Sequence, residues 1–366
     1  MMIDTERLLT TFLDLVRIPS PPGQEGAVAD AIAARLGALG IAVERDEVGN
    51  LIARVDGVGE PLLLTAHMDT VVPCEGVEPV VRGEGDARIV ASAGDTILGA
   101  DDKAGVAILL EVLAVLAEKE LDHRPLELLF TVGEEKGLRG VKALDVGRFR
   151  ATMGLGLDVA GVPGILVVHA PSQDHWRAVV HGRAAHAGGN PEAGISAIQV
   201  AAEGIARMPL GRIDDETTAN IGVIQGGRAT NIVPDRVELY GEARSRNVVK
   251  LEKQIRAMSA ALEESAAARG ATVEIDVRRS YDGYRFSEDA PIVRLVSEAV
   301  RSVGIEPLLA PTGGGSDSNV LVARGIDVVQ MSVGMHAVHT TDEQIAVADM
   351  ETTARMVLAC VASAQS

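Results

Sequence analysis

The chain has 366 residues, which is long for a single hydrophobic core, so we expect two domains. A net charge of -18 and an aromatic content of only 2% argue against nucleic acids and anionic membranes as partners, because these favour clustered Lys and Arg, and bases also favour aromatic stacking. No segment approaches the roughly 20 apolar residues of a membrane span, and the early acids in MMIDTERLLTTF do not suit a signal peptide. A cytoplasmic location is expected.

The first part of the chain alternates between helical and extended patterns. Apolar spacing predicts helices at residues 3–18, 26–40 and 104–120, and strands at residues 41–46, 50–55, 61–67 and 126–132. The sequence PSPPG must end the first helix, and a glycine suits the end of the second. Strands separated by helices predict a largely parallel sheet with helices on both faces.

The pattern changes near residue 173. Strands are predicted at residues 174–188, 217–227, 236–245 and 271–280, with helices at 194–208 and 248–270. After the helical segment at 287–304 the mixed rhythm returns. We therefore expect a discontinuous domain of residues 1–172 and 287–366, interrupted by a small α+β domain of residues 173–286.

The apolar segment PLLLTAH ends on a histidine, and an aspartate follows two residues later. Because strand side chains repeat every two residues, His67 and Asp69 would project in the same direction at the end of this strand. Ligand sites in α/β proteins form at such ends. A match this short also fits a capped strand end at the surface, so its meaning depends on the rest of the chain.

Other segments place polar groups in similar positions. TILGADDKAG carries Asp101 and Asp102 to the start of an apolar helix, where acids also serve as caps. LELLFTVGEEKG ends on two glutamates, which a surface turn would also accept. The further candidates after apolar segments are Glu134, Glu135, Asp158, His336 and His339.

These residue types together favour a divalent metal centre. Zinc accepts histidine nitrogen and carboxylate oxygen, and the two cysteines, Cys74 and Cys360, provide neither a cysteine-based zinc site nor a disulfide framework. Two histidines and three carboxylates suit two metals that share one bridging carboxylate. One further carboxylate would remain as a general base for amide hydrolysis.

Nine motifs occur in order over almost the whole chain: HMDTV, LGADDKAG, GEEKGLRG, LDVAG, GRAAHAG, TNIVPD, EARS, GGGSDSN and HTTDE. With them the chain resembles the co-catalytic zinc aminopeptidase family, which includes peptidase T, the aminoacylases and the glutamate carboxypeptidases. It is most similar to the peptidase T-like di- and tripeptidases. The resemblance implies an α/β catalytic domain with a mixed, largely parallel sheet between helices, and an inserted α+β lid that also forms a homodimer.

The resemblance also implies the metal ligands. His67 and Asp158 would bind one ion, His339 and Glu135 would bind the other, and Asp101 would bridge the two. Zinc is the expected metal, with cobalt or manganese as alternatives. The match to HTTDE favours His339 over His336.

The same resemblance implies the catalytic groups. Glu134 would be the general base, Asp69 would orient His67 through the other ring nitrogen, and His186 would steady the oxyanion. A cis peptide bond is implied between Asp101 and Asp102. Asp102 itself fits a capping acid.

Substrate binding is expected from four residues. Asn231 and Arg244 resemble groups that receive the substrate, and an arginine fork suits a carboxylate. Gly314 and Ser316 lie in TGGGSDSN, which offers backbone amides for an anion. This segment lacks the Lys-Ser/Thr pair of a phosphate loop, and GGSDS does not satisfy the G-x-S-x-G serine motif.

The predicted function is that of a metal-dependent exopeptidase that releases the N-terminal residue of di- and tripeptides. Hydroxide bound between two zinc ions would attack the peptide, with Glu134 moving the proton. The alternatives are a carboxypeptidase or an N-acyl-amino-acid deacylase of the same family, and a binding module without catalysis. The metal ligands do not distinguish the exopeptidase from the carboxypeptidase or the deacylase. The presence of Glu134 argues against the binding module.

Overall fold

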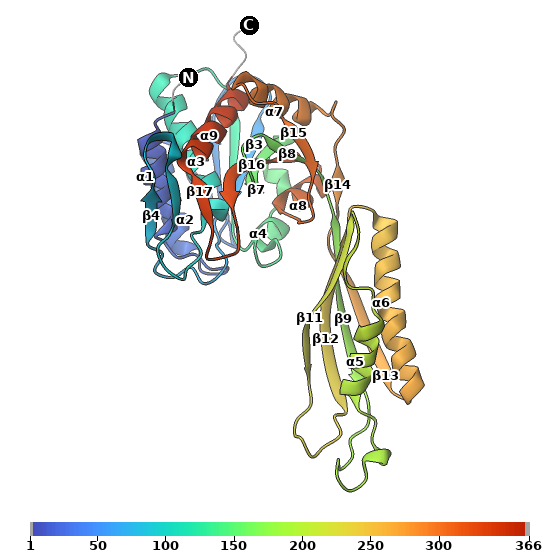
Figure 1. Ribbon diagram of the computed structural model, residues 1–366. Helices are drawn as coiled ribbons and strands as arrows, with labels where there is room; N and C mark the ends of the chain where they lie inside the picture. The colour runs from blue at the N-terminus through green and yellow to red at the C-terminus, as the bar shows by residue number, and fades with distance from the viewer. Residues whose placement is uncertain (1–2, 363–366) are drawn as a thin grey trace. The chain divides into compact units, whose positions relative to one another are not determined.

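The computed structural model describes residues 3–362, which form two compact units. Unit 1 comprises the residues up to Val168, Arg285–Pro311 and the residues from Ser316 onward, and unit 2 comprises His169–Tyr284 with Thr312–Gly315 (Figure 1). The chain of unit 2 is therefore inserted into that of unit 1. The expected boundaries, 172/173 and 286/287, lie within a few residues of these divisions, but no sequence pattern indicated that residues 312–315 belong to unit 2.

The large sheet of unit 1 has a parallel centre and antiparallel flanks. The four central strands, in order, are β6 (Leu126–Thr131), β3 (Leu62–His67), β7 (Met153–Ala160) and β16 (Asp327–His336). One flank adds β2 (Leu51–Val55) and β1 (Val43–Arg45), and the other adds β17 (Gln344–Ala346), β5 (Ile89–Ser92) and β4 (Pro79–Arg82). Both flanks pair antiparallel, so the predicted mixed sheet is confirmed and its parallel part is confined to the centre.

Complete burial explains the apolar sequences of the central strands. All six residues of β3 and all six of β6 are buried, as expected for parallel strands covered on both faces. A branch of the sheet leaves β16 through β8 (Ile165–Ala170), which also pairs with β15 (Leu308–Pro311) and the two-residue β14 (Tyr284–Arg285).

Helices pack against this sheet and against one another. Contacts link α1 (Thr5–Val16) to α3 (Ala100–Lys119), α3 to α9 (Val347–Val361) and α9 to α7 (Pro291–Ser302). A second group consists of α4 (Arg139–Ala143) and α8 (Asp317–Ala323), and α8 also contacts β16. Helix α2 (Gly26–Ala38) packs beside β1, and 3-10 turns occur at Gly85–Ala87 and Val146–Arg148. Apolar side chains of the helices and central strands form one buried core.

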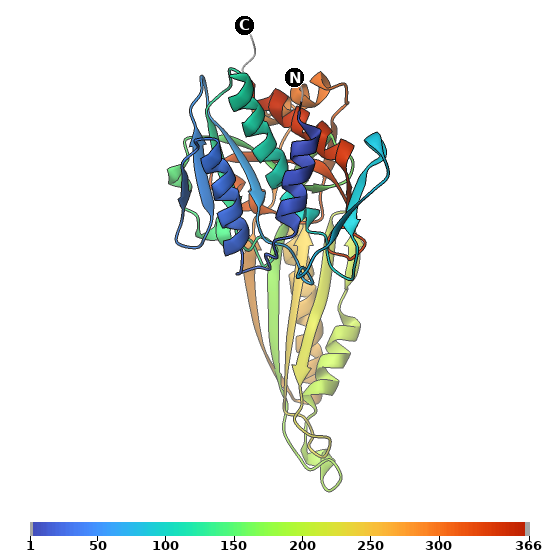
Figure 2. The same cartoon turned by 90° about the vertical axis from the view of Figure 1, so that its left-hand side faces the viewer.

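Unit 2 is a five-stranded antiparallel sheet with two helices on one face (Figures 1 and 2). The strands, in order, are β10 (Gly211–Asp214), β11 (Thr217–Gly226), β12 (Arg236–Ser245), β9 (Ser172–His181) and β13 (Thr272–Tyr281). The helices are α5 (Ala197–Arg207) and α6 (Val248–Arg269), with a 3-10 turn at Pro191–Ala193. Their separate core centres on Trp176, which is 1% exposed.

One strand of unit 2 is shorter than predicted. The alternating pattern at 174–188 predicted a single strand, but β9 ends at His181. A Cβ at Gly182 would lie 2.1 Å from the carbonyl oxygen of Ile195, so the chain approaches another segment closely here and turns away from the sheet. His186 therefore lies in the exposed loop that follows. Strand β10 had no clear sequence signal.

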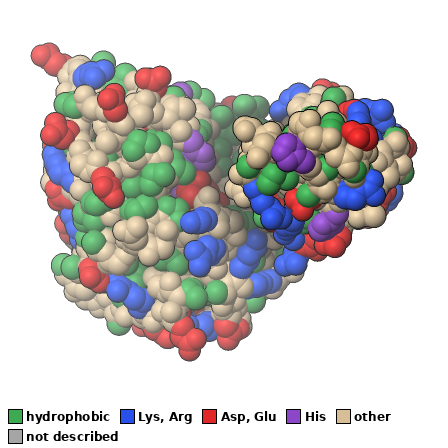
Figure 3. Space-filling view, turned by 90° about the horizontal axis from the view of Figure 1, so that it is seen from below, with side chains coloured by type: hydrophobic (Ala, Val, Ile, Leu, Met, Phe, Trp, Pro, Cys, Tyr) green, Lys and Arg blue, Asp and Glu red, His purple; other side chains and the backbone are tan. Residues whose placement is uncertain are grey.

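Charged side chains of both signs and apolar side chains are interspersed on the face drawn in Figure 3. Within residues 3–362, no helix combines the length and apolarity that crossing a membrane requires.

Candidate metal centre

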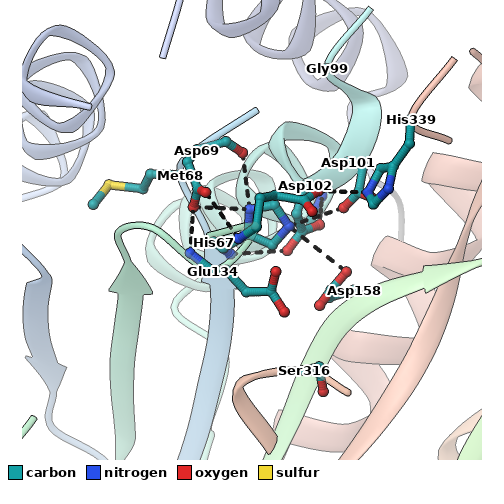
Figure 4. Close-up of polar contacts among 12 residues, drawn as sticks. His67, Met68, Asp69, Gly99, Asp101, Asp102, Glu134, Asp158, Ser316 and His339 are labelled. Atoms are coloured by element: carbon teal, nitrogen blue, oxygen red, sulfur yellow. Dashed lines mark hydrogen bonds and ion pairs between the residues drawn. The ribbon is translucent and has the colours of Figure 1, made fainter. Parts of the chain in front are cut away.

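The predicted metal ligands converge where the four central strands end. His67 is the last residue of β3, and Asp158 lies near the end of β7. Two other ligands follow strands in the sequence: Glu135 comes after β6 and His339 after β16. Asp101 joins them from the start of α3 (Figure 4). Parallel strands bring their carboxyl ends to one edge, which explains why segments so far apart in sequence meet here.

Asp101 lies between the two imidazoles. Its Oδ1 is 3.0 Å from Nε2 of His67, and its Oδ2 is 3.1 Å from Nε2 of His339. Each histidine therefore directs one ring nitrogen at a different oxygen of the same carboxylate. This is the geometry expected of a carboxylate that bridges two ions.

Each imidazole also has a second carboxylate nearby. Glu135 Oε1 is 2.7 Å from Nε2 of His339, and Asp158 Oδ1 is 3.8 Å from Nε2 of His67. Ligand atoms of His67, Asp101 and Glu135 also lie within 4.8 Å of one another. Asp101 thus lies within reach of both histidines, each of which has one of the carboxylates that the resemblance pairs with it.

The acidic groups of this cluster repel one another in a buried setting. Burial raises the pKa values of Asp158 and Glu134 well above their ordinary range, and neighbouring carboxylates raise them further. Burial would lower the pKa of His67, but Asp101 and Asp69 raise it to well above the usual value. Hydrogen bonds to Asp101 and Glu135 raise the pKa of His339 to about 10.

The raised pKa values favour the protonated forms of Asp158, Glu134 and both imidazoles, whereas burial alone would raise the pKa of Asp101 but hydrogen bonds to the imidazoles lower it. Divalent cations would displace those protons and offset the repulsion, and the donors are the imidazole nitrogens and carboxylate oxygens that zinc accepts. The residues present therefore fit a metal site, and Asp101 is the donor that faces both imidazoles.

The start of α3 is shaped to present Asp101. The peptide bond between Asp101 and Asp102 is cis, as the resemblance implied, and both residues have non-helical torsion angles. Asp102 accepts the backbone N–H of Gly105, the capping contact expected for it, and also the backbone N–H of His67. It thereby connects α3 to the end of β3.

Glu343 holds the same turn from the opposite side. Its carboxylate accepts the backbone N–H groups of Gly99 at 2.6 Å and Asp101 at 2.9 Å. Burial raises the pKa of this carboxyl to about 7. Glu343 lies in HTTDE, four residues after His339, so one loop carries a predicted ligand and also fixes the turn that carries another. The motif alone did not indicate this role of Glu343.

His339, and not His336, belongs to the cluster. His336 is the last residue of β16 and is paired with Gln344 of β17. The chain then turns back, and His339 has a φ of 63°, a left-handed conformation in which histidine is enriched among non-glycine residues. This turn directs its ring toward Asp101.

Asp69 contacts His67 differently from the expectation. Nδ1 of His67 is 3.0 Å from the backbone carbonyl oxygen of Asp69, whereas the nearest carboxylate oxygen is 3.5 Å away. The carboxylate instead accepts the backbone N–H groups of Glu134 at 2.9 Å and Glu135 at 3.1 Å. The residue therefore fixes the ring through its carbonyl group and the glutamate pair through its side chain.

Glu134 is buried, and its carboxylate points into the space that the Asp158 carboxylate also faces (Figure 4). The adjacent glutamate contacts His339 instead, so the two neighbours point to different partners. Glu134 belongs to neither of the two predicted sets of metal ligands. A general base is expected to be free of the metal ions in this way.

A glutamine that the sequence analysis missed links Asp158 to Ser316. Gln330 on β16 accepts the backbone N–H of Asp158 at 3.1 Å and donates to Oγ of Ser316 at 3.2 Å. A Cβ at Gly156 would lie 2.3 Å from the glutamine Oε1, so only glycine leaves room for this side chain. Ser316 is the N-cap of α8, with a capping box to Asn319.

His186, predicted to steady the oxyanion, and the predicted substrate-binding residues other than Ser316 belong to unit 2. His186 and Asn231 are exposed, and Arg244 lies on β12 with its guanidinium bound to Glu242 at 2.8 and 3.1 Å. The backbone N–H of Gly314 donates to Thr312 Oγ1 at 3.1 Å. The structure thus brings the metal ligands, Asp69 and Glu134 together in unit 1 and places these four residues in unit 2.

Fold and site together define a class of protein. The model of peptidase family M20/M25/M40 matches residues 63–363, and the chain belongs to this family. It is a metallopeptidase.

Individual relatives agree with this assignment. The chain is 41% identical to the aminopeptidase PepT of Bacillus cereus, with a TM-score of 0.87 and 99% of each chain covered. It is 39% identical to a tripeptidase of Staphylococcus aureus, with a TM-score of 0.92 over 99% of this chain and 98% of the other. Peptidase T of Escherichia fergusonii is 26% identical over 96% of this chain and 97% of its own length.

Proposed function

We propose that the protein is an exopeptidase that uses two divalent metal ions, zinc in the first instance, to release the N-terminal residue of di- and tripeptides. The observation that carries the proposal is the position of Asp101 between His67 and His339, with a second carboxylate beside each histidine. The relatives described as an aminopeptidase, a tripeptidase and peptidase T support the substrate class.

The chain would hold the two ions with separate donors and one shared donor. His67 and Asp158 would bind one ion, His339 and Glu135 would bind the other, and Asp101 would bind both. Ions bound there lower the pKa of water and polarise the carbonyl group of the scissile bond. Burial of His67 and Asp101 limits competing water on their side of the centre, whereas His339 is exposed.

Glu134 moves the proton in this proposal. Its carboxylate takes the proton of the attacking water and delivers it to the nitrogen of the leaving group, which breaks the peptide bond. Asp69 keeps the side chain in place because it binds the backbone N–H of Glu134. The raised pKa of Glu134 suits a group that must hold a proton for part of the reaction.

His186 would donate a hydrogen bond to the oxyanion that forms. Its Nδ1 accepts the backbone N–H groups of Gly188 at 3.1 Å and Gly189 at 2.9 Å. A neutral imidazole that accepts at Nδ1 carries its proton on Nε2. Two backbone contacts therefore fix the tautomer in which Nε2 is a donor, as an oxyanion contact requires.

Arg244 and Asn231 would receive the peptide beyond the scissile bond, with Arg244 bound to a carboxylate. Glu242 fixes the plane of the guanidinium of Arg244, which orients the group for such a contact. Gly314 and Ser316 would line the path of the substrate chain, near the capped start of α8.

A substrate screen tests the proposal. Zinc-, cobalt- and manganese-loaded protein would be supplied with a free tripeptide, the same tripeptide with an acetylated N-terminus, and the same tripeptide with an amidated C-terminus. The free tripeptide should lose its N-terminal residue, and acetylation should abolish turnover. Preferential hydrolysis of the acetylated peptide at its acyl group would identify a deacylase, and release of the C-terminal residue would identify a carboxypeptidase.

The proposal includes a homodimer formed through unit 2, in which His186 of the partner subunit serves each metal centre. Mixing two inactive variants tests this arrangement. A dimer of His186→Ala and Glu134→Gln subunits contains one site with an intact Glu134 and an intact His186, so partial activity should return. No recovery, despite demonstrated subunit exchange, would contradict action across the dimer.

A further inference from the structure

The Glu134–Glu135 pair lies in the segment 132–135. Each of the four backbone N–H groups of this segment donates to a side chain from elsewhere in the chain. Val132 donates to Asn50 Oδ1 at 3.0 Å, and Gly133 donates to Glu25 Oε1 at 2.9 Å. Glu134 and Glu135 donate to the two oxygens of Asp69. The position of the pair is therefore set by contacts outside its own segment.

Neither the sequence patterns nor the proposed mechanism uses Asn50 or Glu25, and of the two it is Glu25 that binds the residue next to Glu134. Glu25 lies just before α2, is 6% exposed, and accepts the N–H of Gly23 as well as that of Gly133 on the same oxygen, both at 2.9 Å. Gly133 is itself buried and has a φ of 60°, so its N–H points inward at a sharp turn immediately before Glu134. Without Glu25 that donor would be buried and unsatisfied.

The loop that carries Glu25 also contacts two other segments of the metal centre. We define the α1–α2 loop as residues 17–25, between the two helices. The carbonyl oxygen of Ile18 accepts Nζ of the buried Lys103 at 2.8 Å, next to Asp102. Ser20 donates through Oγ to the carbonyl oxygen of Met68 at 2.8 Å and accepts the N–H of Thr70 at 2.9 Å, on either side of Asp69.

The α1–α2 loop thus touches all three segments that carry His67, Asp101 and Glu134. It lies before residue 63, where the match to the family model begins. We propose that Glu25 is a positioning residue of the active site: its carboxylate holds the backbone of Gly133 and so keeps Glu134 and Glu135 in their places. This inference rests on the proposed roles of those two glutamates.

The carboxylate acts through one oxygen, which makes its role separable from charge. Glu25→Gln retains an oxygen that can accept both N–H groups, whereas Glu25→Ala removes it. Glu127 provides a matched control in the same unit. Its side chain is 3% exposed, and its carboxylate accepts the backbone N–H groups of Arg150 and Ala151. Neither of these two residues is a predicted site residue.

The experiment compares wild type, Glu25→Ala, Glu25→Gln, Glu127→Ala and Glu134→Gln. Each is measured for thermal midpoint, cobalt affinity by calorimetric titration, and kcat and KM on a tripeptide. Glu25→Ala should lower kcat by about 10- to 100-fold and weaken the binding of one cobalt ion by about 10-fold, as losses of supporting contacts do, with a much smaller change in KM. Glu25→Gln should restore most of both values. Glu127→Ala should lose thermal stability but keep the kcat and cobalt affinity of the wild type.

Wild-type kcat and cobalt affinity in Glu25→Ala would overturn the inference, and so would equal losses in Glu127→Ala. If Glu25→Ala does not fold, Glu25→Asp takes its place, because its carboxylate is retracted by one methylene group and the same losses are expected. A wild-type protein that hydrolyses no peptide would refute the proposed function, and cobalt affinity would still decide the role of Glu25. A third outcome is an active wild type, an inactive Glu134→Gln variant and an unaffected Glu25→Ala variant. This outcome would refute the role of Glu25 and leave the proposed function intact.

Discussion

The metal centre and the predicted substrate residues of unit 2 differ in how their side chains are held. His67, Asp69 and Glu134 are 2%, 0% and 8% exposed, and bonds from distant segments fix them. His186 and Asn231 are exposed, and His186 is fixed by two glycines of its own loop. His67, Asp69 and Glu134 therefore depend on the folded core of unit 1, with the exposed His339 as the exception in the centre, whereas His186 is oriented locally on a loop.

The sharpest test of this contrast within the centre is the glutamate pair. Glu134→Gln should retain two metal ions and lose about 100- to 10,000-fold in kcat, because the general base is removed while the ligands remain. Glu135→Ala should instead lose metal, since its carboxylate lies 2.7 Å from His339. Metal analysis and steady-state kinetics measure both effects. Equal metal loss in the two variants would show that the pair does not divide its work.

His186→Ala tests the locally held group. Loss of an oxyanion donor typically costs about 100- to 1,000-fold in kcat, and KM should change far less because the contact forms mainly in the transition state. Both metals should remain, and the thermal midpoint should stay near that of the wild type, because the side chain is exposed. A fall in metal content would mean that this loop supports the centre structurally, and the contrast would not hold.

Asp69→Asn tests the buried support. One carboxylate oxygen becomes an amide that donates, and it would then face the N–H of Glu134 or Glu135, which also donates. We expect activity or metal affinity to fall by about 10- to 100-fold with the fold intact. Because His67 is held by the carbonyl group of Asp69, its ring should keep its position in a crystal structure of the variant. A displaced His67 ring would contradict this division of contacts.

A separate prediction concerns stability in the metal-free protein. Asp317 is 4% exposed, Thr131 donates to its Oδ2, and Oδ1 has no hydrogen-bond partner among the described residues. Burial raises its pKa from 3.8 to about 6, so between these values the folded state binds more protons and the free energy of unfolding falls as pH rises. The loss is complete above pH 6, and a shift of about two units amounts to about 3 kcal/mol.

Asp317→Asn cannot ionise and should therefore escape this loss. Denaturant unfolding at pH 4 and pH 7 would measure the change. The variant should gain stability relative to the wild type by about 1–3 kcal/mol on going from pH 4 to pH 7. A constant difference between the two proteins across this range would show that Asp317 does not carry the burial cost assigned to it.

Helices and strands with a continuous apolar pattern were predictable from the sequence, and so were the polar residues at their ends. The strands that end at His67 and Thr131 follow from apolar runs, and the positions of Asp101 and His339 follow from motifs. The end of β9 at His181 was missed because the alternating pattern continues after the chain has left the sheet.

The residues that support the site were not predictable in the same way. Glu25 binds a backbone group 108 positions away, and Glu343 binds one 244 positions away. Such contacts are made to backbone N–H groups of a distant segment. The side chains of that segment give no sign of the contact in the sequence. A single sequence therefore indicates which groups carry the chemistry, whereas the groups that hold them become visible only in the folded chain.

In the proposed function, Asp101 bridges two metal ions that have distinct other ligands. Anomalous scattering from crystals of the zinc-loaded protein tests it most directly. Two zinc peaks per chain should appear on either side of the Asp101 carboxylate, one in contact with His67 and Asp158 and the other with His339 and Glu135. A single peak shared by His67, Asp101 and Glu135, the three residues whose ligand atoms already lie within 4.8 Å of one another, would contradict the account.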